Sequence, residues 1–275
     1  MLFEPYRNEP FADYSDPATL AAFKEALESV RGQLGRDYPL TIGGASVTTG
    51  EYLESYDPSR KDRLVGRASK AGPREIELAM DAAWLAYGTW SRWSMADRAR
   101  LLVKLAAIMR RRRDELAAWL VFEASKNYLE AIADVAEAID FCEYYARIAL
   151  PLAEPLPTYD YPGEENTTVF QPMGVGLVIP PWNFLLAILV GTAVGPVVVG
   201  NTVIIKPSPA TPIIGAKFME LVAEAGFPAG VINLLTGDDA VLGDALVDHP
   251  RTRFINFTGS VATGVRIFER AAKVQ

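Results

Sequence analysis

The sequence predicts an α/β fold, with an open parallel sheet in its carboxyl-terminal part and helices in its amino-terminal part. Four short, almost wholly apolar runs begin near residues 175, 202, 231 and 253, and helical stretches separate them. Apolar strands that alternate with helices are typical of a parallel sheet whose two faces are both covered. The intervals between the runs are long enough for the crossover helix of a right-handed β-α-β unit.

The amino-acid composition is that of a globular protein, and the net charge argues against some kinds of binding partner. The chain has 275 residues, half of them hydrophobic and 22% charged, so it can bury a substantial core. Its 27 basic and 34 acidic side chains give a net charge of −7, which argues against nucleic acid and anionic membranes because both select a basic face. A single cysteine excludes an intramolecular disulfide and a cysteine-based metal site, so we expect no metal and a cytoplasmic location.

One apolar stretch, Phe184–Gly200, has nearly the length of a membrane span. Gly191, Gly195 and Pro196 interrupt it, so a buried helix explains it better than insertion into a bilayer. The amino terminus is acidic and broken by prolines, unlike a signal peptide.

The part of the chain before Pro151 has helical periodicity. Asp16 and Pro17 have the pattern of an N-cap followed by a proline at the first helical position. We expect helices over residues 17–34, 73–87, 96–122 and 130–150, and strands over 38–44 and 62–69. The arginine run 110–113 points around its helix, which indicates a solvated, ion-paired surface rather than an anion site.

Composition also divides the chain into three regions. Residues 1–150 are the helical part, and residues 151–172 are rich in proline and polar side chains, which predicts an exposed arm. Residues 173–275 hold the four apolar runs and therefore the parallel sheet.

Polar residues and glycines follow each predicted strand of that sheet. The segments are 180–183, 206–208, 236–238 and 258–260. Because ligands of open α/β sheets bind outside the carboxyl ends of the strands, we expect a ligand site at this edge.

Three residues at this edge each have two interpretations. Lys206 ends a buried strand and needs a partner, either a ligand or a carboxylate from elsewhere in the chain. Asn183 could cap the helix that follows it or donate a hydrogen bond to an oxyanion. Gly259, which with Ser260 opens a helix over 260–272, could make a tight turn or help to hold a pyrophosphate, and the interval to Gly264 matches neither the dinucleotide nor the P-loop motif.

No residue stands out as a nucleophile or a base. Cys142 lies on the apolar stripe of the helix 130–150, where packing is its expected role. His249 lies between a helix and a strand, at the edge opposite the expected ligand site, so we interpret it as a turn residue.

Four motifs in this order resemble the NAD(P)-dependent aldehyde dehydrogenase family: PPWNF at 180–184, KPS at 206–208, GVINLLTG at 230–237 and FTGSVATG at 257–264. Further runs, including NEPFADYS (8–15) and DVAEAIDFCEYYAR (134–147), are similar to the L-glutamate γ-semialdehyde (1-pyrroline-5-carboxylate) dehydrogenase branch. The resemblance extends from about residue 3 to the end of the chain, and implies the Rossmann-like NAD-binding domain of that family.

The resemblance also implies roles for individual residues. Asn183 would stabilise the oxyanion formed from the aldehyde, and Phe184 would line the path of the substrate. Lys206 would hold the adenosine ribose, and Gly259 with Ser260 would lie at the pyrophosphate. The implied cofactor-binding residues are Ile179, Pro181, Trp182, Lys206, Ser208, Gly237, Gly243, Gly259 and Ser260.

The implied ligands are NAD, with NADP not excluded, and an aldehyde such as L-glutamate γ-semialdehyde. The arm 151–172 matches the hairpin by which the family forms homo-oligomers. Pro209 departs from the pattern, because the family often has there a glutamate that binds ribose hydroxyls. Neither the glycine-rich segment of the family's general-base glutamate nor that of its nucleophilic cysteine occurs in these residues.

We therefore expect this chain to be the amino-terminal part of such a dehydrogenase, without the catalytic domain and inactive by itself. Two alternatives remain at this point. The chain could be a non-catalytic dinucleotide-binding module, or it could belong to a dehydrogenase for another aldehyde.

Overall fold

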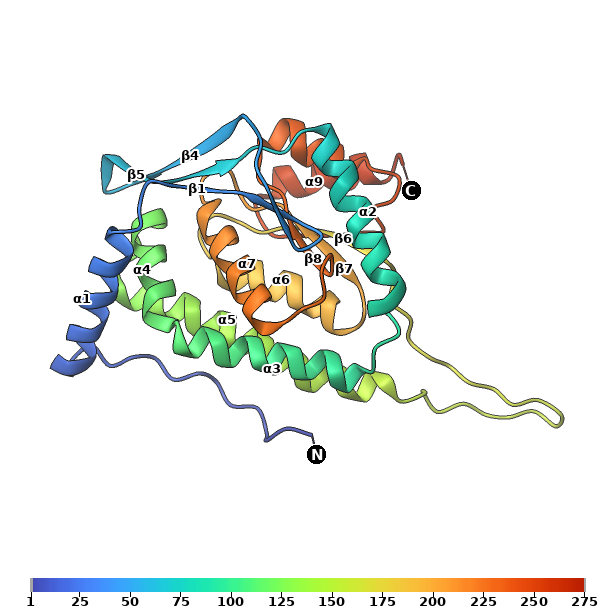
Figure 1. Ribbon diagram of the computed structural model, residues 1–275. Coiled ribbons are helices and arrows are strands. Elements are labelled where there is room, and N and C mark those ends of the chain that lie inside the picture. Colours follow the sequence, from blue (N-terminus) through green and yellow to red (C-terminus); the bar gives the residue numbers. More distant parts are fainter. Residues whose placement is uncertain (1, 275) are drawn as a thin grey trace.

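The computed structural model describes residues 2–274, and its main sheet has six strands in the order β3-β2-β8-β7-β6-β9 (Figure 1). The strands are β2 (Leu40–Ile42), β3 (Ala45–Val47), β6 (Val175–Ile179), β7 (Thr202–Ile205), β8 (Ile232–Leu234) and β9 (Phe254–Phe257). Neighbours among β6 to β9 pair in parallel, which confirms the four predicted strands and the parallel sheet. β2 and β3 add an antiparallel edge, so residues on both sides of Pro151 build this sheet.

The order of the parallel strands reverses once. From β6 the chain moves outward to β7 and then β8, and it returns to place β9 on the other side of β6. The carboxyl ends of β6 and β9 therefore flank a topological switch point, the place where open α/β sheets bind ligands.

A second sheet has the order β1-β5-β4. It contains β1 (Arg36–Tyr38), β4 (Tyr52–Asp57) and β5 (Arg60–Ser69), and its hairpin β4–β5 was predicted only in its second half. β4 was missed because half of its residues are polar, and its two buried positions, Ser55 and Asp57, are among them, so no apolar alternation marks it. The strand expected over 38–44 is divided between β1 and β2 at Pro39, which has no N–H to continue a ladder.

The helices agree with the prediction except in one place. They are α1 (Pro17–Arg31), α2 (Pro73–Trp90), α3 (Met95–Arg111), α4 (Arg113–Ala124), α5 (Tyr128–Ala149), α6 (Ala187–Val198), α7 (Ile213–Ala225), α8 (Asp244–Val247) and α9 (Val261–Ala271), with short 3₁₀ and π segments η1 (Leu150–Ala153) and η2 (Asp239–Gly243). The single helix expected over 96–122 is wrong, because Arg112, with φ −101° and ψ 17°, separates α3 from α4. Neither glycine nor proline marks this break, and the apolar spacing continues across it.

Local signals elsewhere are confirmed. The Asp16 carboxylate accepts hydrogen bonds from the amides of Ala18 and Thr19 and so caps α1. Each arginine of the run 110–113 forms an ion pair with a carboxylate, as expected for a solvated surface.

Strands β6 and β7 are buried on both faces, with alternate residues in two apolar layers. Leu177 and Ile204 pack with α2 and α8, whereas Val178 and Ile205 pack with α6 and α7. Gly176 in β6 has no room for a side chain, since a Cβ there would lie 2.0 Å from the ring of Phe254 in β9. Each buried aliphatic side chain of this kind contributes roughly 1.5–3 kcal/mol, so the two layers hold the strand ends in place.

The helical layer below the sheet contains the predicted stripe of α5 (Figure 1). Ile132, Val135, Ile139, Cys142 and Ala146 are all buried there. α6 packs against α5 and is buried almost throughout, as expected for the apolar stretch 184–200. Across residues 2–274 we find no helix with the length and apolarity required to span a membrane.

Residues 154–172 form the thin hairpin that projects from the molecule in Figure 1. A bridge between Leu156 and Thr168 joins its two limbs, and Tyr159 near the tip is 98% exposed. The expectation of an exposed arm is confirmed, and its role in oligomerisation stays a prediction.

Candidate functional site

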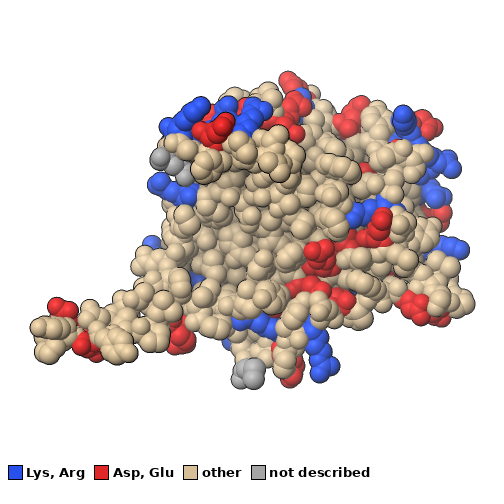
Figure 2. All heavy atoms as spheres, turned by 180° about the vertical axis from the view of Figure 1, so that it is seen from behind, with Lys and Arg blue, Asp and Glu red and all other residues tan. Residues whose placement is uncertain are grey.

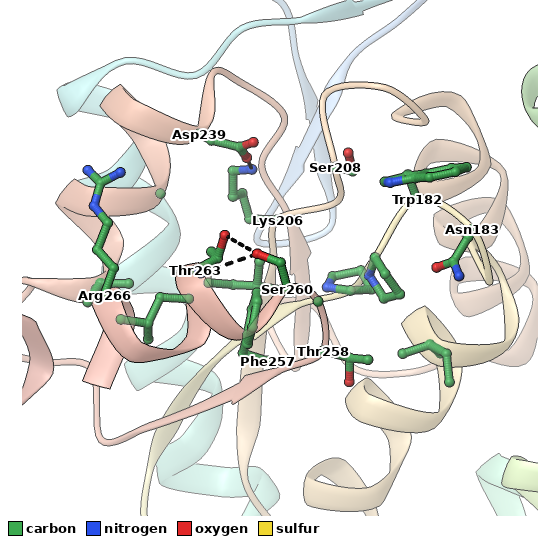
Figure 3. Close-up of a pocket in the computed structure, with 18 of the residues that line it drawn as sticks. Trp182, Asn183, Lys206, Ser208, Asp239, Phe257, Thr258, Ser260, Thr263 and Arg266 are labelled. Atoms are coloured by element: carbon green, nitrogen blue, oxygen red, sulfur yellow. Dashed lines mark hydrogen bonds and ion pairs between the residues drawn. The ribbon is translucent and has the colours of Figure 1, made fainter. Parts of the chain in front are cut away.

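A cleft of about 730 Å³ opens at the carboxyl ends of β6, β7 and β9, at the switch point of the sheet (Figure 3). All of the sequence-predicted site residues except Gly237 line it: Ile179, Pro181, Trp182, Asn183, Phe184, Lys206, Ser208, Gly243, Gly259 and Ser260. The expected ligand edge therefore coincides with this cleft.

The loop from β6 to α6 forms one wall of the cleft. Trp182, Asn183 and Phe184 are exposed there. Asn183 does not cap α6: the amide of Ala187, the first helical residue, instead donates to Asp134 Oδ1 at 2.6 Å. No group in residues 2–274 forms a hydrogen bond with the Asn183 amide, which leaves it available to a ligand in the cleft.

A buried ion pair supports this loop from the helical layer. Lys126 Nζ lies 2.8 Å from Asp134 Oδ2 and 4.5 Å from the centre of the Phe184 ring. Burial raises the pKa of Asp134, and the nearby Lys126 ammonium opposes that rise. The pair thus connects α5, the start of α6 and one wall of the cleft.

Lys206 has the carboxylate partner that the sequence could not identify. Its side chain is 1% exposed, and its ammonium contacts Asp239 Oδ1 and the carbonyl oxygen of Pro207. Figure 3 shows Lys206 rising from the floor of the cleft toward Asp239. Gly243 lies beside the same side chain, since a Cβ there would be 3.7 Å from Lys206 Cε.

The segment 236–238 after β8 was expected at the ligand edge, but it serves the connection between β5 and α2. The Thr236 hydroxyl donates to the carbonyl oxygen of Ser69, and the Asp238 carboxylate pairs with Lys70 at 2.7 Å. Gly237 packs against Leu242, where an added Cβ would lie 2.9 Å from a methyl group. Gly237 is therefore the one predicted cofactor residue outside the lining of the cleft.

The first turn of α9 faces the loop between β6 and α6 across the cleft (Figure 3). Ser260 caps this helix, because its hydroxyl oxygen accepts a hydrogen bond from the amide of Thr263 at 3.2 Å. Gly259 makes a close turn, since an added Cβ would lie 2.6 Å from the ring of Phe257. The turn brings the positive end of the α9 dipole to the cleft, where an anion is stabilised.

Sequence reasoning missed four polar residues that line the cleft: Thr263, Asp239, Asp244 and Arg266. Arg266 pairs with Asp244, so the cleft contains two cations and two carboxylates among its described lining residues. Asp239 could have been found from its place just after a strand end. Arg266 lies inside α9 and Asp244 is the first residue of α8, and neither directly follows a strand end that would mark it.

The remaining nucleophile and base candidates lie outside the cleft, as expected. Cys142 is fully buried on α5, and burial raises the pKa of its thiol. His249 lies in the turn between α8 and β9, and its Nε2 is 3.1 Å from Glu77. No cluster of metal-ligating side chains occurs within residues 2–274.

Apolar side chains beside the cleft are widely exposed. Val261 and Phe268 on α9 are 84% and 74% exposed, and Trp182 is 60% exposed. Charged side chains are sparse over the centre of the face in Figure 2, which is the side opposite to that of Figure 1.

Comparison with known proteins connects this geometry to a family. The sequence profile described as "Aldehyde dehydrogenase family" matches residues 46–275. A 1-pyrroline-5-carboxylate dehydrogenase from Geobacillus thermodenitrificans is 52% identical over the whole chain, which covers 53% of that relative. The chain thus spans about half the length of the curated relatives it matches.

Solved structures agree. The crystal structure of 1-pyrroline-5-carboxylate dehydrogenase from Thermus with bound NAD is 52% identical, with a TM-score of 0.98 over the whole chain and 53% of that protein. The NAD-bound enzyme from Mycobacterium tuberculosis is 30% identical, with a TM-score of 0.91 over 98% of this chain and 51% of that one. This chain belongs to the aldehyde dehydrogenase family, and its fold is that of the part of these enzymes that the match covers.

Proposed function

We propose that this chain is the amino-terminal, dinucleotide-binding part of an NAD-dependent dehydrogenase that oxidises L-glutamate γ-semialdehyde to L-glutamate. The observation that carries the proposal is the cleft at the switch point, where a buried lysine and the first turn of a helix face a loop with an unpartnered amide. The 52% identity to the NAD-bound enzyme from Thermus supports both the cofactor and the substrate.

The residues of the cleft suit a dinucleotide. Lys206 offers a cation to the adenosine ribose, and the first turn of α9 with Gly259 and Ser260 offers amides to the pyrophosphate. Ile179, Pro181, Trp182, Ser208 and Gly243 supply the remaining walls. The nicotinamide, when bound, supplies the hydride acceptor.

The loop between β6 and α6 suits the reacting aldehyde. Asn183 is exposed at the cleft and its amide N–H groups have no partner in residues 2–274, so they can stabilise a developing oxyanion. Phe184, with Lys126 against its ring, offers an apolar wall for the aldehyde chain.

Oxidation of an aldehyde by this family's chemistry also needs a reactive thiolate. The one thiol in this sequence, Cys142, is buried on α5 with a raised pKa and does not line the cleft. We therefore propose that residues 1–275 bind the cofactor but do not turn over aldehyde by themselves.

The test is titration of the purified protein with NADH, followed by nicotinamide fluorescence sensitised by tryptophan. We expect saturable binding that Lys206→Met weakens by about tenfold or more, because a buried charged hydrogen-bond donor is lost. Lys70→Met is the matched control, since Lys70 pairs with Asp238 outside the cleft.

Two results would contradict the proposal. Absence of NADH binding by a folded protein removes the dinucleotide function. Thiol-dependent oxidation of L-glutamate γ-semialdehyde by residues 1–275 removes the claim that this chain is inactive alone. A separate measurement, the mass of the native protein, tests the alternative, because a mass near 30.0 kDa would favour a non-catalytic module.

A further inference from the structure

Asp239 is the carboxylate in contact with the buried lysine of the cleft. It is the first residue of η2, which follows β8, and its side chain is 74% exposed whereas that of Lys206 is 1% exposed. One oxygen, Oδ1, contacts the Lys206 ammonium, and the other has no partner in residues 2–274. A hydrogen-bond acceptor is thus held at the wall of the cleft, beside its buried cation (Figure 3).

The two neighbouring carboxylates are committed elsewhere. Asp238, the preceding residue, pairs with Lys70 and does not line the cleft. Asp244 pairs with Arg266 and lies 3.4 Å from Arg270. Among the described lining residues, Asp239 is therefore the carboxylate that contacts Lys206, and its second oxygen can accept a hydrogen bond from a ligand.

Asp239 also changes the charge that a phosphate would meet. Lys206 is neutralised by Asp239, and the other cation of the cleft, Arg266, is neutralised by Asp244. Ser208 and Pro209, which follow Lys206 on the same loop, carry no charge. A ligand hydroxyl beside Lys206 finds an acceptor in Asp239, whereas a phosphate ester at the same place finds a carboxylate of like charge.

We propose that Asp239 determines cofactor specificity: it accepts hydrogen bonds from the adenosine ribose hydroxyls beside Lys206 and repels a 2′-phosphate, so the site selects NAD over NADP. This inference rests on the proposed function, because it requires the dinucleotide to lie with its adenosine ribose at Lys206. The role of Asp239 in specificity can nevertheless be disproved without disproving dinucleotide binding at the cleft.

The test compares Asp239→Asn with Asp238→Asn. Each removes one negative charge from adjacent residues, but only Asp239 contacts Lys206 and lines the cleft. Asparagine keeps an oxygen for the Lys206 ammonium, so the buried lysine stays partnered and the fold is expected to remain. Far-ultraviolet circular dichroism checks this.

The readout is the ratio of dissociation constants for NADPH and NADH, two probes that differ only in the 2′-phosphate. The same ratio for 2′,5′-ADP and 5′-AMP isolates the adenosine half. We expect the unsubstituted protein to bind NADH at least about tenfold more tightly, and Asp239→Asn to move the ratio about tenfold toward NADPH. Asp238→Asn should leave the ratio within about twofold.

Three outcomes would overturn the inference. Equal shifts in both variants would show a general charge effect rather than a contact. Equal affinity of the unsubstituted protein for NADH and NADPH would show that Asp239 does not discriminate, while the dinucleotide site would stand. Binding of neither nucleotide would remove the inference together with the proposed function.

Discussion

Three of the helices that follow the parallel strands, α6, α7 and α9, differ in what occupies their first turns. The first turns of α6 and α7 are filled by buried carboxylates from the helical layer: Asp134 accepts from the amide of Ala187, and Glu123 accepts from those of Ile213 and Ile214. Among residues 2–274, the side-chain acceptor at the first turn of α9 is the hydroxyl oxygen of its N-cap Ser260, and this turn lies on the cleft.

This difference indicates which helix is available to a ligand. Every helix presents unpaired amides and a partial positive charge at its amino end, so each attracts an anion. The chain supplies acceptor oxygens from its own carboxyl groups at α6 and α7, and those helix ends are closed. At α9 no carboxylate occupies the first turn within residues 2–274, which agrees with the proposal that the pyrophosphate of the cofactor occupies it.

The largest expected effect is from removal of the carboxylate at α6. Asp134→Ala should lower the free energy of unfolding by about 3–5 kcal/mol, because it leaves Lys126, whose side chain is 10% exposed, as an unpaired buried charge. Urea unfolding followed by circular dichroism measures this.

The control for this substitution is Asp37→Ala, whose partner Arg67 is exposed and whose loss should cost less than about 1 kcal/mol. If both substitutions lower the free energy of unfolding equally, Asp134 does not stabilise the first turn of α6. The proposed difference between α6 and α9 would then be wrong.

The carboxylate at α7 should make stability depend on pH. Burial raises the pKa of Glu123 to about 7, although the amides of Ile213 and Ile214 oppose the rise. A pKa above the unfolded value means that the native state holds the proton more tightly. The contribution of Glu123 is therefore fully present below about pH 4.5 and declines as pH rises through about 7.

Glu123→Gln removes this titration. We expect the unfolding free energy of the unsubstituted protein, minus that of the variant, to fall by about 3 kcal/mol between pH 4.5 and pH 8. Urea unfolding at several pH values gives the difference. If this difference in unfolding free energy is constant or grows with pH, burial does not disfavour the ionised form of Glu123.

A third substitution gives α9 the carboxylate that α6 and α7 already have. Ser260→Asp keeps an N-cap but places a negative charge at the cleft, so NADH affinity should fall about tenfold while stability changes by less than about 0.5 kcal/mol. Ser260→Asn is the control, because asparagine caps a helix without the charge. Equal affinity of the two variants for NADH would mean that the first turn of α9 does not hold the anionic part of the cofactor.

Much of the cleft was predictable because its residues follow strand ends directly. The strands β6 to β9 are short apolar runs, and Lys206, Asn183 and Gly259 each come within a few residues of one. Parallel strands bring such ends to the same edge whatever the rest of the chain does. The exception is Gly237, whose segment turns to the connection between β5 and α2 through contacts with residues more than a hundred positions away.

The sequence by itself determined the parallel sheet, the helical stripe of α5, the exposed arm and the edge at which the cleft opens, because local periodicity and turn chemistry encode them. Only the tertiary structure decided which helix ends are closed, because Asp134 and Glu123 act 53 and 90 residues away from the amides they bind. It also decided which of two adjacent aspartates contacts Lys206. Asp239 pairs with the buried Lys206, whereas Asp238 pairs with Lys70 on the other side of the segment. Local patterns describe one element at a time, and these contacts exist only once the helical layer and the sheet are packed together.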